Sequence, residues 1–457
     1  MIGLGTMGRN LLLNLADHGF TVSGYDKEIS QQEKLNQIGH KNIMVCDTVK
    51  SFIQSLESPR KIILLVPAGK IVDYVINDLR PHLEKEDILI DGGNSHFTDT
   101  DRRFKDLQGT GVHFMGMGVS GGEDGARYGP SMMPGSNIAS YEVMRPILEK
   151  IAAKADGNPC VQFIGNGAAG HYTKMVHNGI EYAMMQMISE VYGVLKKMGC
   201  TNHELHQFFL SCNHSLLRGY LIEITAAIFL KKDDLSDADL VDMILDKAGQ
   251  KGTGMWTSQS AFELNIPLTI IDSAVSARNI SAMKTERVNN SKSIPIPNSQ
   301  IERDRQELKE IAKESLYLGF LLCYTQGLHL LQAASLKYDY QLQIPNILEV
   351  WKGGCIIRST MLGLFKSAYE NEPMLINAFA SSLISKEISE RITELKQFVT
   401  IGIQLGITTP ALSNALNYIL AYSTEQLPAN LIQAQRDYFG AHTYERIDRD
   451  GIFHTDW

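Results

Sequence analysis

The chain has 457 residues and a formal net charge of −8, because 51 acidic side chains outnumber 43 basic ones. Globular domains run to roughly 100–200 residues, so this length favours two or three domains with ample material for a core. A content of 44% apolar and 21% charged residues is typical of globular proteins and excludes a disordered or fibrous chain. The negative charge, without any basic block, argues against a nucleic-acid partner.

The cysteines and the hydropathy indicate the compartment. No apolar run approaches the roughly 18–20 residues that span a bilayer, and no signal or transit sequence is recognisable, so we expect no membrane partner. Six cysteines occur singly, without a CxxC pair or ligand-like spacing to histidine, so we expect reduced thiols, a cytoplasmic location and no metal site. They are Cys46, Cys160, Cys200, Cys212, Cys323 and Cys355.

Short apolar runs alternate with amphipathic stretches in the first third of the chain. Helices are predicted over residues 9–18 and 71–84. Strands are predicted over residues 21–25, 42–46, 61–66, 87–91, 112–118 and 161–164. Alternating strands and helices indicate an α/β fold with a doubly wound parallel sheet.

The pattern changes after about residue 167. No proline occurs between Pro159 and Pro267, and long windows carry helical apolar spacing, so an all-helical region is predicted. A polar and aromatic tail without sustained periodicity begins near Glu425. The clearest helical windows are residues 172–198, 237–248, 301–336 and 385–404, and the predicted units are 1–167, 168–424 and 425–457.

A GxGxxG motif, Gly3-Leu4-Gly5-Thr6-Met7-Gly8, opens the chain and is followed at once by a helical pattern. In dinucleotide-binding folds these glycines allow a tight turn, close approach to a pyrophosphate, and close packing of helix on strand. Asp26 follows at the spacing of an acid that binds a ribose hydroxyl. Only two residues precede the motif, so we expect the strand that feeds the turn to be largely missing. A plain glycine turn is the alternative interpretation.

Two later strands are predicted to end in glycine-rich sequences, Asp91-Gly92-Gly93-Asn94-Ser95 and Gly118-Val119-Ser120-Gly121-Gly122-Glu123. Ligands of open α/β sheets lie beyond the carboxyl ends of the strands. Glycine there exposes backbone amides to a ligand, and Asn94 and Ser120 add neutral hydrogen-bonding groups. Either motif alone could be a simple turn, but two together favour a shared site.

One predicted helix carries Lys174, His177, Asn178 and Glu181 at positions i, i+3, i+4 and i+7, which places them on one face. A polar stripe is often just a solvated surface. Here the rest of the helix is strongly apolar, so the stripe is expected to face a cleft. A lysine and a carboxylate spaced along one substrate could act as base and acid.

These residues resemble those of the decarboxylating 6-phosphogluconate dehydrogenases, and the resemblance extends over essentially the whole chain. It implies a Rossmann-type domain, a large all-α domain and an extended C-terminal tail that reaches the partner subunit of a homodimer. The motifs that carry it are Lys174–Tyr182, Gly249–Gly254, Gln433–His442, Ile90–Ser95, Gly118–Gly122 and Gly125–Pro130.

The resemblance implies oxidation of 6-phosphogluconate at C3 by a nicotinamide cofactor, loss of CO2 and formation of ribulose 5-phosphate, a step of the pentose phosphate pathway. Lys174 is then the general base, and Glu181 the acid that protonates the enediol. The substrate residues implied are Asn94, Ser120, Gly121, Gly122, His177, Asn178, Tyr182, Lys251, Thr253 and Arg278, with Arg436 and His442 of the partner subunit. The predicted cofactor residues are Gly3, Gly5, Thr6, Met7, Gly8, Asp26, Lys27, Val66, Ala68 and Asn94.

The cofactor region departs from the family pattern, so NADP and NAD both remain open. Family members commonly have Asn-Arg-Thr after the second strand, where this chain has Asp26-Lys27-Glu28. A carboxylate at that position favours a free ribose diol and repels a 2′-phosphate. Pro67 also replaces the usual lysine of the following turn. Family membership favours NADP, whereas these residues favour NAD.

Two other functions stay open on the sequence. The same scaffold could oxidise another 3-hydroxy acid, although Lys251, Arg278 and Arg436 would then have no phosphate to bind. A non-catalytic nucleotide-binding protein is the second alternative, because a sheet without its first strand would hold cofactor poorly.

Overall fold

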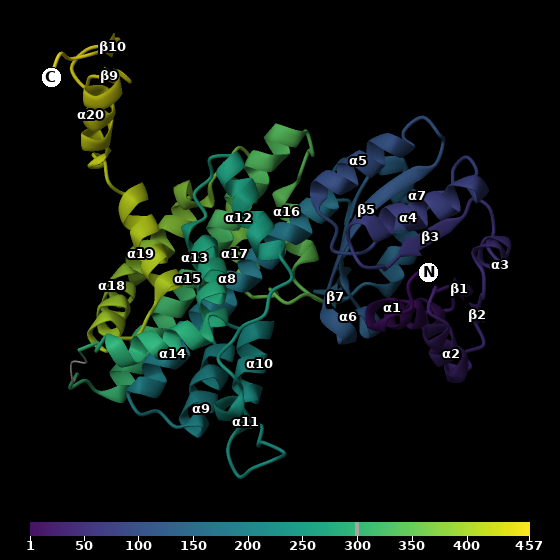
Figure 1. Cartoon of the computed structure of the whole chain (residues 1–457), viewed down its shortest axis with the longest axis horizontal. Helices are drawn as coiled ribbons and strands as arrows, with labels where there is room; N and C mark the ends of the chain where they lie inside the picture. The colour runs from purple at the N-terminus through teal and green to yellow at the C-terminus, as the bar shows by residue number, and fades with distance from the viewer. Residues whose placement is uncertain (298–300) are drawn as a thin grey trace.

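A computed structural model describes residues 1–297 and 301–457. An α/β part lies at the right of Figure 1 and a helical part at the left, and a thin connection leads from the helical part to a separate C-terminal tail. This is the predicted fold class: a Rossmann-type sheet followed by a large helical region.

The main sheet runs in the order β2, β1, residue 2, β3, β4, β5, β6. Neighbours from β2 to β5 are parallel, and β6 is antiparallel to β5. The strands are β1 (Val22–Gly24), β2 (Ile43–Val45), β3 (Lys61–Leu64), β4 (Ile88–Asp91), β5 (His113–Ser120) and β6 (Ser131–Gly135).

The first three residues occupy the centre of this sheet. Ile2 forms parallel bridges to Tyr25 on one side and Leu64 on the other. Its N–H donates to the carbonyl of Ile63 and its carbonyl accepts from Leu65, both at 2.8 Å. The strand that feeds the glycine turn is thus very short, as predicted, yet its place is filled and hydrogen-bonded on both sides. The non-catalytic alternative loses its structural basis.

Apolar side chains of the sheet point alternately to two cores, as expected for a doubly wound sheet. Ile63 packs with Leu12 and Met144 on one face, whereas Ile62 packs with Val72 and Phe114 on the other. The covering helices are α1 (Thr6–Asp17), α2 (Ile29–Ile38), α3 (Val49–Gln54), α4 (Lys70–Leu79) with the 3₁₀ turn η1 (Arg80–His82), α5 (Phe97–Leu107), α6 (Gly122–Tyr128) and α7 (Ile138–Ile151).

Two strand predictions need correction. Residues 161–164 form no strand, because only isolated bridges pair Val161 with Met132 and Gly165 with Gly135. The strand β6 was not predicted, since Pro134 and Gly135 suggest a turn. Proline lacks an N–H and is tolerated here because β6 pairs with only one regular strand. A tight hairpin joins β7 (Lys154–Ala155) to β8 (Asn158–Pro159).

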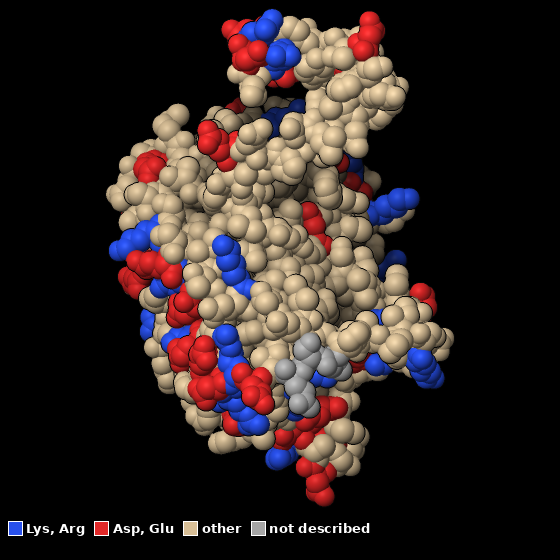
Figure 2. Space-filling model, turned by 90° about the vertical axis from the view of Figure 1, so that its left-hand side faces the viewer, with Lys and Arg blue, Asp and Glu red and all other residues tan. Residues whose placement is uncertain are grey.

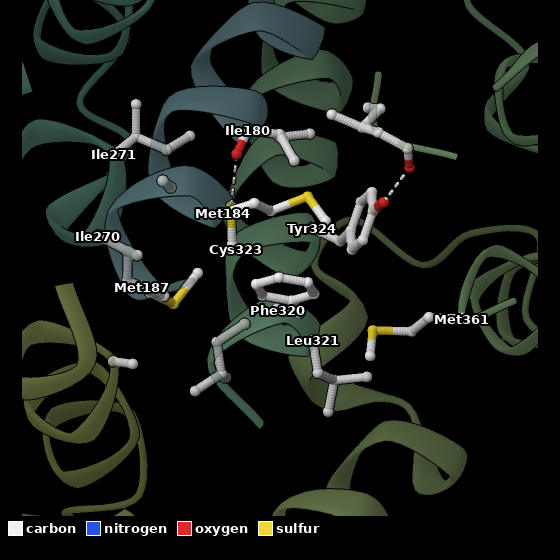
Figure 3. Close-up of a cluster of buried hydrophobic side chains, with 14 of the residues drawn as sticks. Ile180, Met184, Met187, Ile270, Ile271, Phe320, Leu321, Cys323, Tyr324 and Met361 are labelled. Atoms are coloured by element: carbon white, nitrogen blue, oxygen red, sulfur yellow. Dashed lines mark hydrogen bonds between the residues drawn. The ribbon is translucent and has the colours of Figure 1, made fainter. Parts of the chain in front are cut away.

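The helical part is built around two long, largely buried helices, α8 (Ala169–Lys197) and α15 (Arg305–Tyr338). Figure 3 shows their contact, where Met184 and Met187 lie beside Phe320 and Cys323. The shorter helices are α9 (Asn202–Asn213), α10 (Tyr220–Ile228), α11 (Leu240–Met243), α12 (Thr253–Glu263), α13 (Thr269–Ala282), α14 (Lys284–Ser293), α16 (Ile344–Val350), α17 (Leu362–Asn371), η2 (Ala378–Ala380), α18 (Ser382–Gln404) and α19 (Pro410–Tyr422).

Three of the four predicted helical windows match α8, α15 and α18 within a few residues. Residues 237–248 do not, because only the single turn α11 is helical. Ile244 and Leu245 are each 61% exposed, so their side chains do not pack against a core that would stabilise a helix.

The C-terminal tail is more regular than predicted. It contains α20 (Ala429–Gly440) and a short hairpin of β9 (Tyr444–Glu445) and β10 (Ile452–Phe453). The carboxylate of Asp437 is fully buried and accepts bonds from the backbone of Thr443 and Thr455 and from the indole of Trp457. Figures 1 and 2 show the tail as a lobe beyond the body.

No helix within residues 1–297 and 301–457 is both long and apolar enough to cross a membrane. All six cysteines are buried thiols.

We predict that Glu190→Ala destabilises the helical part. The Glu190 carboxylate is 2% exposed and accepts the backbone N–H groups of Ala411 at 2.8 Å and Leu412 at 2.9 Å, at the start of α19. Alanine leaves both buried donors unpaired, which should lower the free energy of unfolding by about 3 kcal/mol. Urea denaturation measures this, with the exposed Glu33→Ala as control. Equal midpoints for the two variants would contradict the prediction.

Candidate active site

The polar face of α8 lies at the carboxyl end of β5. Lys174 is 7% exposed and His177 is fully buried. Their helix approaches the strand closely because residue 118 is glycine: a Cβ there would lie 2.4 Å from the Cβ of Lys174. The polar stripe therefore faces the interior of the protein, and the solvated-surface alternative is wrong for these two residues.

His177 joins the polar side chains around it. Its Nε2 lies 3.2 Å from the hydroxyl of Ser120, and its Nδ1 lies 3.1 Å from Oδ1 of Asn178. The Nζ of Lys174 is 3.4 Å from the same Nδ1, and Oε2 of Glu181 is 3.9 Å from it. Lys174 and Glu181 thus both approach the same nitrogen of one imidazole, as residues one turn before and one turn after it on a helix can.

Burial shifts the protonation of this cluster toward neutral forms. It lowers the pKa of Lys174 and raises the pKa of Glu181, although their mutual attraction opposes both shifts. Burial and the neighbouring Lys174 ammonium hold the pKa of His177 well below its ordinary value. A neutral lysine beside a protonated glutamic acid is the combination that a base and an acid in one site require.

A second group of residues lies one turn further along α8. Tyr182 is buried, and the guanidinium carbon of Arg278 from α13 lies 3.5 Å above its ring centroid. The hydroxyl of Tyr182 accepts the backbone N–H of Lys251 at 3.4 Å, and Arg278 donates to the carbonyl of Gly249 at 3.1 Å. Thr253 is the first residue of α12, so the amides of that helix terminus lie close to the backbone of Lys251 and to the Tyr182 ring that carries Arg278. This combination suits a phosphate.

The glycine-rich turns border the same region. Ser120 is the last residue of β5, and Gly121 and Gly122 follow with φ of +116° and +63°. A side chain at Gly121 would lie 2.6 Å from the carbonyl oxygen of Gly354. Asn94 follows the adjacent parallel strand β4 and is exposed. The two turns therefore meet at one edge of the sheet, as predicted.

Arg103 was not predicted as a site residue, yet it ties the Asn94 turn to the start of α4. Its side chain is 2% exposed and contacts Asp91 and Ser95 of the Asn94 turn. It also binds Asp73 at 2.7 Å and donates to the carbonyl of Gly69 at 2.9 Å. An arginine in an amphipathic helix suggests a surface position, and only the burial reveals this role. Cys355 and Trp351, also not predicted, pack beside Lys174 and His177.

The glycine motif has the geometry that the dinucleotide interpretation requires. Gly3 has φ of +92°, and a Cβ there would lie 2.4 Å from the carbonyl of Leu65. A Cβ at Gly8 would lie 1.8 Å from the carbonyl of Gly3, whereas one at Gly5 would meet nothing. The third glycine thus permits helix packing, and the second leaves the N-terminus of α1 open to a ligand. Only glycine fits at two of the three positions.

A cavity of about 510 Å³ lies beside this turn. Thr6, Met7 and Gly8 belong to the first turn of α1, and Ala68 lies in the turn before α4. The predicted cofactor residues that line the cavity are Gly3, Gly5, Asp26, Lys27 and Val66. Its shape and position suit the adenosine half of a nicotinamide dinucleotide.

Arg436 and His442 do not join the cluster within one chain. Arg436 lies on α20 and His442 follows it, both in the protruding tail. Among the described residues, the side-chain hydrogen bond of Arg436 is to the neighbouring Gln433, at 3.2 Å.

Known proteins match this chain over its full length. Residues 1–165 match the family model for the NAD binding domain of 6-phosphogluconate dehydrogenase, and residues 170–457 match that for its C-terminal domain. The chain is 50% identical to the NADP(+)-dependent, decarboxylating 6-phosphogluconate dehydrogenase of Bacillus subtilis strain 168, and 47% identical to the decarboxylating enzyme of Escherichia coli K12. Each alignment covers 100% of this chain and 98% of the relative.

A solved structure of Plasmodium falciparum 6-phosphogluconate dehydrogenase superposes with a TM-score of 0.96 at 42% identity. It covers 100% of this chain and 99% of the other, and it was studied in its apo form, with its cofactor NADP+ and with its substrate 6-phosphogluconate. Both the sequence and the fold therefore place this chain in the 6-phosphogluconate dehydrogenase family.

Proposed function

We propose that the chain catalyses the oxidative decarboxylation of 6-phosphogluconate to ribulose 5-phosphate and CO2, with a nicotinamide dinucleotide as hydride acceptor. One observation carries the proposal: Lys174 and Glu181 both approach Nδ1 of the buried His177, with their pKa values displaced in opposite directions. Two residues with cationic side chains lie close by: Arg278 is stacked on Tyr182, the residue after Glu181, and the backbone N–H of Lys251 donates to the same tyrosine. A 3-hydroxy acid without a phosphate would leave these cations without a ligand.

Lys174 acts first, as general base. Its lowered pKa increases the fraction of neutral amine, which takes the proton of the C3 hydroxyl while the hydride leaves C3. The bound nicotinamide supplies the hydride acceptor. The resulting ammonium of Lys174 donates a hydrogen bond to the new C3 carbonyl and stabilises the negative charge that develops on that oxygen.

Decarboxylation then needs an electron sink and a proton donor. The C1–C2 bond breaks and CO2 leaves. The electron pair of the broken bond passes toward the C3 carbonyl, which Lys174 polarises. The C3 oxygen takes the proton of the Lys174 ammonium, and the product is an enediol. Glu181 is protonated more readily than an exposed glutamate because burial raises its pKa, and it delivers its proton to the carbon that lost CO2. The neutral Lys174 takes back the hydroxyl proton as the ketone of ribulose 5-phosphate forms.

The remaining site residues bind and orient the substrate. Ser120, Gly121 and Gly122, with Asn94, His177 and Asn178, supply neutral donors and acceptors for the carboxylate and hydroxyl groups. Tyr182, Thr253, Lys251 and Arg278 hold the phosphate, and a guanidinium can do so through two parallel bonds.

A homodimer with shared active sites completes the proposal. The tail protrudes from its own chain, and large apolar side chains on it are exposed, among them Phe439 at 71% and Ile432 at 61%. Such side chains normally become covered by a partner. Arg436 and His442 of the partner subunit would then reach the phosphate and the sugar. The three proposed units are the dinucleotide domain 1–167, the helical domain 168–424 and the tail 425–457, and the thiols fit a cytoplasmic location.

A direct assay tests the proposed activity. Full-length protein with 6-phosphogluconate and NAD or NADP should generate the near-ultraviolet absorbance of the reduced nicotinamide together with an equal amount of CO2. Reduction without CO2, or turnover of 3-hydroxyisobutyrate in place of the phosphorylated substrate, would contradict the assignment. The absence of turnover with both cofactors would contradict it as well.

Lys174→Met should abolish activity and yet stabilise the fold. Loss of a general base lowers kcat by roughly 10²–10⁴-fold. The pKa of Lys174 is lower in the folded than in the unfolded chain, so between those two values the unfolded chain binds more protons and stability rises with pH. Methionine removes the free-energy cost of burying the amine and should raise the free energy of unfolding by about 1 kcal/mol at neutral pH. A less stable, inactive variant would instead indicate a structural role for Lys174.

Mixing two inactive variants tests the shared site. In a heterodimer of Lys174→Met and Arg436→Ala chains, one site combines both changes and the other combines Lys174 with Arg436 of the partner subunit. Random pairing gives half heterodimers, so co-expression should restore about a quarter of wild-type activity. Arg436 acting within its own chain would give no recovery.

A further inference from the structure

The cavity beside the glycine turn carries the features that distinguish the two nicotinamide dinucleotides. They differ by one group, a phosphate on the 2′-oxygen of the adenosine ribose, which carries a charge of roughly −1.5 to −2 at neutral pH. The side chains at the end of β1 face that oxygen in dinucleotide-binding folds. In this chain the end of β1 is followed by Asp26, Lys27 and Glu28, and all three line the cavity.

Asp26 is fixed in position rather than free to turn away. Its Oδ2 accepts the N–H of Leu4, inside the glycine turn, at 2.6 Å. Its Oδ1 accepts the N–H of Glu28 at 2.9 Å, and its carbonyl oxygen accepts from Gln32 at 2.7 Å. A carboxylate offers about four lone-pair positions, so two bonds leave capacity for the two hydroxyls of an unmodified ribose.

The charge of the cavity opposes a second phosphate group. Among the described residues that line it, three are carboxylates, Asp26, Glu28 and Asp78, and one is a cation, Lys27. The formal charge of the lining is therefore −2. Lys27, the one cation of the described lining, is outnumbered by three carboxylates.

The nearby groups that could offset this negative charge are already hydrogen-bonded or are absent. Arg9, one turn into α1, donates to Gln31 at 3.2 Å and to the carbonyl of Leu4 at 3.3 Å. Pro67, on the opposite wall, has neither a charge nor an N–H to offer.

We propose that this chain selects NAD over NADP, with Asp26 as the specificity-determining residue. The proposal rests on the proposed function, because it concerns the hydride acceptor of that same site. The fixed carboxylate binds the ribose diol of NAD, and together with Glu28 and Asp78 it repels the 2′-phosphate of NADP.

Kinetics and direct binding test the two proposals separately. With 6-phosphogluconate saturating, kcat/KM for NAD should exceed that for NADP by about tenfold or more, with the difference mainly in KM. Fluorescence titration with NADH and NADPH should give the same order of affinity without any turnover. A lack of turnover with both cofactors would contradict the proposed activity, while the titration would still show which cofactor binds more tightly. Tighter binding of NADPH would overturn the preference.

Matched variants assign the preference to one side chain. Asp26→Asn keeps one oxygen acceptor and removes the charge, so the ratio of kcat/KM values for NAD and NADP should fall by about tenfold, and NADPH should bind correspondingly tighter. Glu33→Gln removes a carboxylate from α2 outside the cavity lining and should leave the ratio unchanged. Equal ratios for wild type and Asp26→Asn would overturn the assignment to Asp26.

Discussion

The close approach of α8 to β5 is the constraint on which the site depends. Gly118 has no side chain, so the backbone of the strand lies against the Cβ of Lys174 and the lysine is carried into the protein interior. Burial then lowers the pKa of its amine and, further along the same helix face, raises the pKa of Glu181. This packing contact thus positions Lys174, and burial favours the neutral forms of both Lys174 and Glu181.

Burying such groups costs free energy, and the packing of the surrounding structure offsets that cost. The core between α8 and α15 is extensive, and it holds the helix firmly enough to keep a lysine out of water. Arg103 likewise holds the turns at the edge of the sheet in place, because its buried guanidinium links Asp91 to Asp73. Both hold in place residues of the proposed site.

A net charge of −8 and an anionic substrate are compatible because the charges are arranged locally. Lys251 and Arg278 come together at Tyr182, whereas Asp26, Glu28 and Asp78 line the cavity at the other end. The positive and the negative side chains are therefore gathered in two separate regions of the chain. A sum over the whole chain cannot reveal this separation.

The sequence by itself determined the alternation of strands and helices, the glycine turn and the polar stripe of α8, because these depend on local periodicity and on the conformational freedom of glycine. Tertiary structure decided the rest. Residues 237–248 have helical spacing but no core to pack on, and β6 forms despite Pro134 because it pairs with β5. The burial of Arg103 and the hydrogen bond from Leu4 to Asp26 join residues distant in sequence. Such contacts depend on how the chain packs, which no local pattern records.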